Sequence, residues 1–281
     1  MEMMLALTVL PPGVDSPARF FMVGALAALI MGAAKGGFAG SVGILSMPLM
    51  LYACQDDPKL SPLGIMLPLL IVCDYVAVTY WRGKWDWRNI RLLVPGAVAG
   101  VAAGSAVLWW FKQMGRAPEA IELPNLALGL TIGVIALAFV ALQALRALRG
   151  QMKAFQPSFA HGFGVGAAAG LTSTLTHSAG PITTMFLLPQ QMPKQRYVAT
   201  ATLYYWIGNQ VKLLPYILLG LLDTGTLTTS AVLAPAVVVG AALGILLHHR
   251  VNQKIFNLIV YALLGLMGIH LVIVSAPKLW R

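Results

Sequence analysis

The sequence predicts an all-α polytopic membrane protein with two homologous halves. Its composition, its long uncharged segments and an internal repeat all support this. Of the 281 residues, 58% are hydrophobic and 10% are charged, whereas soluble domains average about 45–50% apolar and about 25% charged residues. Several apolar runs approach the roughly 20 residues that cross a bilayer core as a helix, and these are residues 62–81, 92–111, 226–247 and 256–275. Continuous runs of this length are not typical of a β-barrel, whose strands are short and alternate in polarity.

An internal repeat divides the chain. A P-x4-G-x3-G pattern begins at Pro95 and again at Pro235, 140 residues later. A Gly-x-x-Asp pattern at Gly83 aligns with one at Gly220, 137 residues later. Duplicated halves are the usual build of secondary transporters, which bind their substrate where the halves meet. We therefore expect an N-terminal segment over residues 1–19, a first transmembrane repeat over 20–150 and a second over 151–281.

Each repeat is predicted to open with a broken helix that forms a re-entrant hairpin, followed by three transmembrane helices. In the first repeat the glycine-rich residues 35–43 interrupt an apolar run, and in the second repeat residues 176–181 do so. Glycine permits non-helical dihedral angles, and Pro181 cannot donate a backbone hydrogen bond to the preceding turn. Irregular backbone at membrane depth is tolerated only where it is buried in protein or lines a cavity.

The distribution of Lys and Arg predicts that the two repeats are inverted. If both hairpins leave on the side they entered, eleven basic residues fall on one side and six on the other, the side of both termini. If the broken segments cross once instead, the split is ten to seven. The positive-inside rule favours the first arrangement, in an inner (cytoplasmic) membrane with both termini outside. The net charge of +10 then belongs to membrane loops, so we expect no nucleic-acid partner.

Four ionisable side chains lie within the apolar segments: Lys35, Asp74, His177 and Lys212. A charge at the bilayer centre costs about 2.5–3.5 kcal/mol on insertion scales, so such groups usually face a cavity or a partner. Lys35 precedes two glycines at the first predicted break, where an ammonium and free backbone N–H groups would bind an anion. The alternative is a lysine that extends to the lipid headgroups.

Lys212 shares one helix face with Asn209 and Tyr216, because the spacing is i, i+3, i+7. An amide, a cation and a phenol on one face suit the oxygens of a small oxyanion. Lys212 could instead form an ion pair with Asp74. Asp74 is a candidate for such a charge pair or for proton coupling, and His177, whose ordinary pKa lies near neutrality, is a candidate for lining the cavity or for coupling.

The candidate substrate-binding residues are Lys35, Gly36, Gly37, Gly40, Gly43, Thr176, His177, Ser178, Gly180, Asn209, Lys212 and Tyr216. The chain has no G-x-S-x-G, H-E-x-x-H or Walker pattern. We therefore expect neither an enzyme nor a bound metal or cofactor.

The order of these motifs resembles the TauE/SafE sulfite exporter family. The resemblance rests on the Lys35-Gly-Gly-Phe segment, Asp74 and the P-x4-G-x3-G helix in the first repeat, and on Gly180-Pro181 and Asn209-x-x-Lys212 in the second. It implies a transporter of sulfur-containing anions such as sulfite, sulfoacetate and other organosulfonates. We accordingly expect a secondary transporter with alternating access around a site between the repeats, with a proton or a cation as coupling ion. The alternatives are an anion channel and a transporter of a non-sulfur organic anion.

Overall fold

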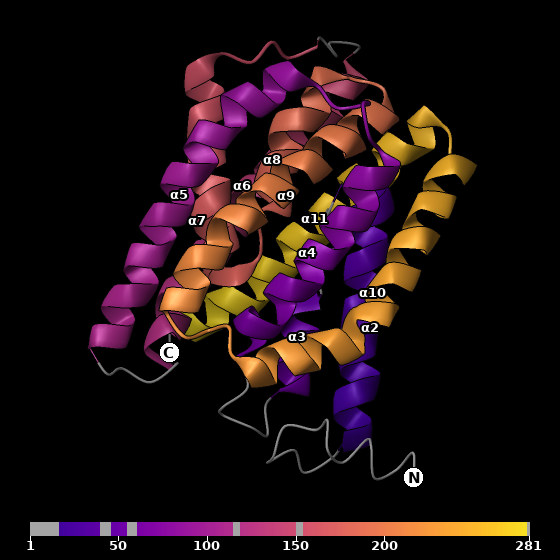
Figure 1. Ribbon diagram of the computed structural model, residues 1–281. Coiled ribbons are helices and arrows are strands. Elements are labelled where there is room, and N and C mark those ends of the chain that lie inside the picture. The colour runs from indigo at the N-terminus through magenta and orange to yellow at the C-terminus, as the bar shows by residue number, and fades with distance from the viewer. Residues whose placement is uncertain (1–16, 40–45, 55–60, 115–118, 150–153, 280–281) are drawn as a thin grey trace.

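The computed structural model describes residues 17–39, 46–54, 61–114, 119–149 and 154–279, and all its regular elements there are helices. Within these ranges ten α-helices and one short 3-10 helix are present, with no strand (Figure 1). The helices are α2 (Pro17–Phe38), α3 (Ser46–Ala53), α4 (Pro62–Tyr80), α5 (Trp87–Gln113), α6 (Glu119–Leu148), α7 (Phe159–Thr176), α8 (Gly180–Leu187), η2 (Leu188–Gln190), α9 (Lys194–Leu218), α10 (Thr224–Arg250) and α11 (Gln253–Leu279).

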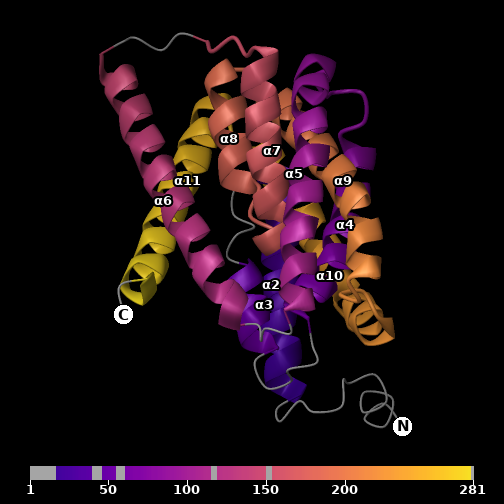
Figure 2. The ribbon, with the colours of Figure 1, turned by 90° about the vertical axis from the view of Figure 1, so that its left-hand side faces the viewer.

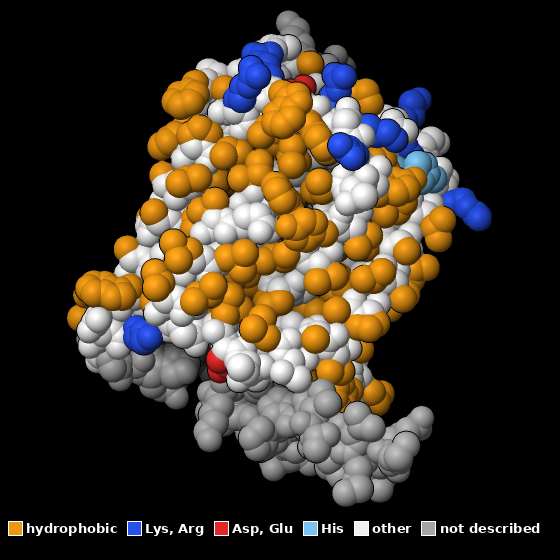
Figure 3. Space-filling model, in the orientation of Figure 1, with side chains coloured by type: hydrophobic (Ala, Val, Ile, Leu, Met, Phe, Trp, Pro, Cys, Tyr) orange, Lys and Arg blue, Asp and Glu red, His pale blue; other side chains and the backbone are white. Residues whose placement is uncertain are grey.

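Six helices are long and apolar enough to cross a membrane. The candidate spans are Ala18–Phe38, Pro62–Tyr80, Trp87–Gln113, Gly129–Leu148, Thr224–Arg250 and Gln253–Pro277. Helix α9 has 25 residues but carries Asn209, Gln210 and Lys212 in its second half. On the face shown in Figure 3, hydrophobic side chains cover the middle, and most of the visible Lys and Arg side chains gather at the upper end. The chain is therefore a multi-pass membrane protein.

Two pairs of helices fold back on themselves. In the second pair, α7 and α8–η2, the two ends that lie away from the break are close together. The backbone N–H of Phe155, just before α7, donates to the carbonyl of Pro189 in η2 at 3.0 Å. At the outer ends of the first pair, α2 and α3, the Arg19 guanidinium lies 5.6 Å from the centre of the Tyr52 ring. The long helix of each pair ends on a left-handed residue, with φ 53° at Ala39 and 54° at His177. Each pair thus enters and leaves at the same end, α2–α3 at the lower end of the molecule and α7–α8 at the upper end (Figure 2).

The breaks differ in how closely they match the expected positions. Helix α7 ends at Thr176 and α8 begins at Gly180, within the predicted interruption. Helix α2, however, continues through Lys35 to Phe38, so the predicted break at Lys35 is wrong. Gly36 and Gly37 are helical because they lie against α10: a Cβ built on them would meet the carbonyl oxygens of Ala241 and Gly244 at 2.4 and 2.1 Å. The two glycines therefore allow the backbones of α2 and α10 to touch.

The long helix of each hairpin packs against a helix of the other half, α2 on α10 and α7 on α5. Glycines make both contacts close. A Cβ on Gly244 would lie 2.2 Å from the carbonyl oxygen of Ala33, and a Cβ on Gly100 would lie 2.0 Å from that of Ala167. The last helices of the two halves, α6 and α11, pack on each other. Small residues therefore bring the helices together as in other membrane bundles.

Equivalent turns precede α5 and α10, which are both 27 residues long. Gly83 and Gly220 adopt φ 77° and 72°, a conformation that favours glycine. Three residues later, the carboxylates of Asp86 and Asp223 cap the two helices by accepting backbone N–H groups at 3.1 and 2.7 Å. The α4–α5 turn lies at the upper end of the molecule and the α9–α10 turn at the lower end (Figures 1 and 2).

Replacing Gly244 with valine tests the contact between α2 and α10. Gly244→Val places side-chain atoms against the Ala33 backbone, and we expect it to lower the free energy of unfolding by about 1–3 kcal/mol, the usual cost of overpacking. Thermal unfolding in detergent measures the change. Gly208→Val is the matched control, because no described atom lies within 4 Å of a Cβ there. Equal stability of the two variants would contradict the close contact.

Candidate functional site

A buried carboxylate connects three helices near the middle of the molecule. Asp74 on α4 accepts from the Lys35 ammonium of α2 through Oδ1 at 2.5 Å and from the Asn209 amide of α9 through Oδ2 at 2.5 Å. Asp74 is fully buried, and Lys35 and Asn209 are nearly so. Both carboxylate oxygens are satisfied by donors from other helices, which is the condition under which a buried charge is tolerated.

The Lys35 ammonium has two further favourable neighbours. Its nitrogen lies 5.3 Å from the centre of the Tyr205 ring, within the range of a cation–π contact. Lys35 also occupies the last turn of α2, where the helix dipole favours a positive charge. The Tyr205 hydroxyl donates to the Ala39 carbonyl just beyond that helix end, at 3.1 Å. Helix α9 therefore holds the end of α2 as well as Asp74.

Lys212 lies on α9, one helical turn beyond Asn209. It is fully buried, and its hydrogen-bond partners are neutral. Its ammonium donates to the Ser173 hydroxyl at 2.9 Å and lies 3.2 Å from Nδ1 of His177. An ammonium has no acceptor, so Nδ1 accepts from Lys212 and the ring proton on Nε2 donates to the Leu63 carbonyl at 3.1 Å. Among the described residues, no carboxylate lies within salt-bridge distance of Lys212. The lysine that pairs with Asp74 is Lys35.

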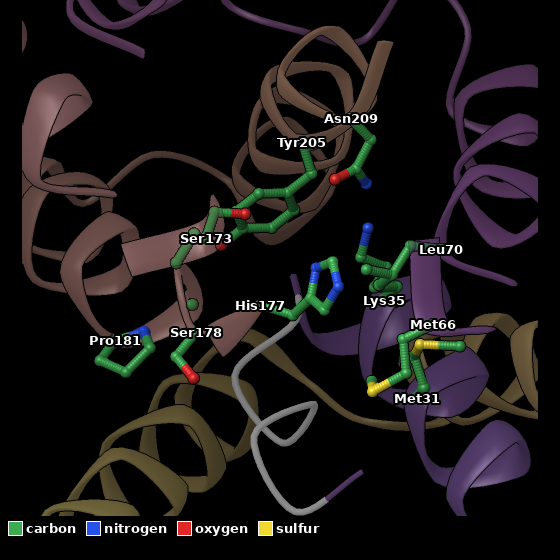
Figure 4. A pocket seen from close by; sticks show the side chains of 12 residues that line it. Met31, Lys35, Met66, Leu70, Ser173, His177, Ser178, Pro181, Tyr205 and Asn209 are labelled. Carbon is green, nitrogen blue, oxygen red and sulfur yellow. The ribbon is translucent and has the colours of Figure 1, made fainter. Parts of the chain in front are cut away.

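A small pocket of about 40 Å³ lies between these groups. At roughly 10–15 Å³ for each water molecule, it has room for about three waters. Figure 4 shows Lys35 pointing toward Asn209, with the His177 ring beside them. The lining residues are Met31, Lys35, Met66, Leu70, Ser173, His177, Ser178, Ala179, Gly180, Pro181, Tyr205 and Asn209. They come from α2, α4 and α9, from the adjacent ends of α7 and α8, and from the break between those two helices.

The structure brings together about half of the predicted site residues. Lys35, His177, Ser178, Gly180 and Asn209 line the pocket. Lys212 lies behind it and contacts two lining residues, Ser173 and His177.

The other candidates lie elsewhere. The Tyr216 hydroxyl donates to the Thr174 carbonyl at 2.7 Å, and the Thr176 hydroxyl donates to the Thr172 carbonyl at 3.0 Å. Gly36 and Gly37 face α10 and do not line the pocket. Gly40 and Gly43 lie outside the described residues.

Comparison with known families now adds to this geometry. The family model described as Sulfite exporter TauE/SafE matches residues 24–271, which is most of the chain. The chain belongs to the TauE/SafE sulfite exporter family. No curated protein and no solved structure matches it. Membership of a transporter family agrees with a function other than catalysis, and it places the pocket within a membrane transporter.

Two polar residues of this TauE/SafE site were not among the predicted set. Tyr205 precedes Asn209 by four residues and Lys212 by seven, so the same helical spacing that grouped Asn209 and Lys212 extends to it. Ser173 is one of several hydroxyl residues near the second break, and the sequence contains no signal that separates it from its neighbours. Its role becomes visible only through its contact with Lys212.

Removing the Asp74 carboxylate tests the buried ion pair. Asp74→Ala leaves the Lys35 ammonium buried without a counter-charge, and we expect a loss of about 3–5 kcal/mol, as for other buried pairs that lose one partner. The double variant Lys35→Met/Asp74→Leu removes both charges, so we expect it to regain most of that stability. Thermal unfolding in detergent compares the three proteins. An Asp74→Ala protein as stable as the wild type would contradict the pair.

Proposed function

We propose that the chain is a secondary transporter of small sulfur-containing anions, sulfite or organosulfonates such as sulfoacetate, in the inner (cytoplasmic) membrane. The observation that carries this proposal is the buried Lys212 ammonium, which lies directly behind the pocket without a carboxylate partner among the described residues. The family supports a sulfur oxyanion as the substrate class.

The charges around the pocket favour an anion. The Asp74 carboxylate compensates Lys35, whereas Lys212 has no carboxylate within salt-bridge distance among the described residues. In a buried site of low dielectric constant, one uncompensated charge attracts an opposite charge far more strongly than it does in water. A bound anion would therefore complete the charge balance of the site.

The pocket also offers hydrogen-bond donors to oxygen atoms. An ammonium has three N–H groups and a carboxamide has two, and Lys35 and Asn209 each direct one to Asp74. Their remaining donors are available to an oxyanion in the pocket, whereas the Ser178 hydroxyl donates to the Thr176 carbonyl at 3.1 Å. The volume suits sulfite, whereas sulfoacetate, with its additional carboxymethyl group, requires the pocket to widen.

We further propose that the two halves are inverted repeats and that access alternates between them. The turns before α5 and α10 lie at opposite ends of the molecule, and the hairpins enter from opposite ends (Figure 2). Each hairpin packs on the other half through α2–α10 and α5–α7, so one half can rock against the other around the pocket. The positive-inside rule assigns the basic end to the cytoplasm. Asp74 and His177 are the candidates for coupling to a proton or cation.

A transport assay with Lys212→Met tests this proposal. In vesicles with the reconstituted wild type on a solid-supported membrane, we expect saturable currents with sulfite or sulfoacetate and none with acetate or chloride. Lys212→Met removes the uncompensated charge, so we expect it to abolish the response. Lys254→Met, the same substitution at an exposed lysine, should retain it. Uptake of radiolabelled sulfite detects electroneutral exchange, which produces no current.

Other outcomes separate the alternatives. Currents that rise with concentration without saturation would indicate an anion channel. Saturable transport of acetate but not of sulfur anions would indicate a carrier of non-sulfur organic anions. Transport by Lys212→Met with an unchanged half-saturation concentration would contradict the role of Lys212.

A further inference from the structure

A second, larger hollow lies between α6 and the second hairpin. It has a volume of about 790 Å³ and is open to the surface, which places it within the roughly 300–1,000 Å³ range of pockets that bind small molecules. Its walls are apolar almost throughout and include Ile135 and Phe139 of α6, Val165 and Ala168 of α7, and Ile182 and Met185 of α8. We call this hollow the α6–α7 cleft.

The cleft exists because α6 packs on α11 and has few contacts with the rest of the molecule. Figure 2 shows α6 leaning away from α7 and α8. A small cluster that includes Phe139 and Met185 joins the α6–α11 pair to the hairpin. The cleft therefore opens on the surface that faces the hydrocarbon of the bilayer, where water cannot fill it favourably.

The length of the cleft matches one leaflet of a membrane. Along α7 it extends from His161 to Thr172, and at 1.5 Å per residue this is about 16 Å. The hydrocarbon core of a bilayer is about 30 Å thick, so one leaflet accounts for about 15 Å. An apolar cleft of this length that begins at one end of the molecule fits one acyl chain.

Positive charge lies at the end of the cleft where that chain would meet its headgroup. The cleft begins at His161 in the first turn of α7. Helix α7 begins at the upper end of the molecule, where most of the Lys and Arg side chains visible in Figure 3 gather (Figures 2 and 3). The Arg88 guanidinium donates to the Pro157 carbonyl at 3.2 Å, just before α7. Arg149 follows the last turn of α6 and is exposed. An anionic headgroup complements the positive charges of Arg88 and Arg149.

We propose that the α6–α7 cleft is a lipid site that holds an acyl chain of an anionic phospholipid from the leaflet at the basic end. The second hairpin separates this chain from the small pocket: Ile182 of α8 faces the cleft, whereas Gly180 and Pro181 line the pocket. On α7, Thr172 lines the cleft and Ser173 the pocket. The lipid chain thus contacts the face of the second hairpin opposite to the face that lines the small pocket. This proposal does not depend on which anion is transported.

Gly164 allows the cleft to be filled without disturbing the fold. It lines the cleft, and no described atom lies within 4 Å of a Cβ built on it. Gly164→Phe therefore places a phenyl ring where the acyl chain would lie. Gly208→Phe is the matched control, since Gly208 also has open space around its Cβ and lines neither hollow.

Photo-cross-linking tests the lipid site. The full-length protein is reconstituted with phosphatidylglycerol that carries a diazirine on its acyl chain, and labelled peptides are quantified by mass spectrometry. We expect the cleft-lining peptides of α6, α7 and α8 to be labelled several-fold more than the exposed outer face of α5. Gly164→Phe should lose most of this labelling, and Gly208→Phe should keep it. The same probe on phosphatidylcholine should label the cleft less.

Two results would overturn the proposal. The first is equal labelling of the cleft and the outer face of α5, and the second is labelling that survives Gly164→Phe. If Gly164→Phe also lowers the mass of the protein in detergent from that of an oligomer to that of a monomer, the cleft is an interface between copies of the chain instead. Equal labelling by the two headgroups would overturn the preference for an anionic lipid.

Discussion

A charge buried at membrane depth requires a partner, and the contact of Asp74 with Lys35 and Asn209 meets that requirement at the centre of this molecule. The contact joins α2, α4 and α9, so one carboxylate fixes the end of the first hairpin helix relative to both halves. Because Asp74 is committed to Lys35, Lys212 is left without a carboxylate partner among the described residues. The selectivity that we propose for anions follows from this arrangement, in which one carboxylate pairs with Lys35 and does not pair with Lys212.

Glycine contacts determine how the two halves are held together. The long helix of each hairpin is bound to the opposite half, with backbones so close that a single methyl group at Gly244 or Gly100 would overlap a carbonyl oxygen. In a bilayer, where apolar burial drives helix association only weakly, such contacts replace the hydrophobic core of a soluble protein. The small pocket lies where the hairpins meet, and the α6–α7 cleft lies behind the second hairpin, so movement of that hairpin would change both spaces.

Much of the helical architecture was predictable because it depends on local chemistry. The repeated Gly-x-x-Asp pattern corresponds to similar turns at Gly83 and Gly220, and the predicted second break at residues 176–181 contains the observed one. The first break begins later than the predicted start at Lys35 because Gly36 and Gly37 permit either a broken helix or a close helix crossing, and only the distant α10 decides between them. Helical spacing grouped Asn209 with Lys212, but the choice of Lys35 as the partner of Asp74 depends on tertiary packing, which spacing along one helix cannot show.

The most direct test of the account is to locate the bound anion. Selenite has the shape and charge of sulfite, and selenium scatters X-rays anomalously, so crystals of the protein grown with selenite would show where the anion binds. The account predicts one anomalous peak in the small pocket, close to Lys35, His177 and Asn209, which disappears in Lys212→Met. A protein that transports sulfite but binds selenite elsewhere, or binds it in the pocket equally well without Lys212, would contradict the central claim that this unpaired lysine creates the anion site.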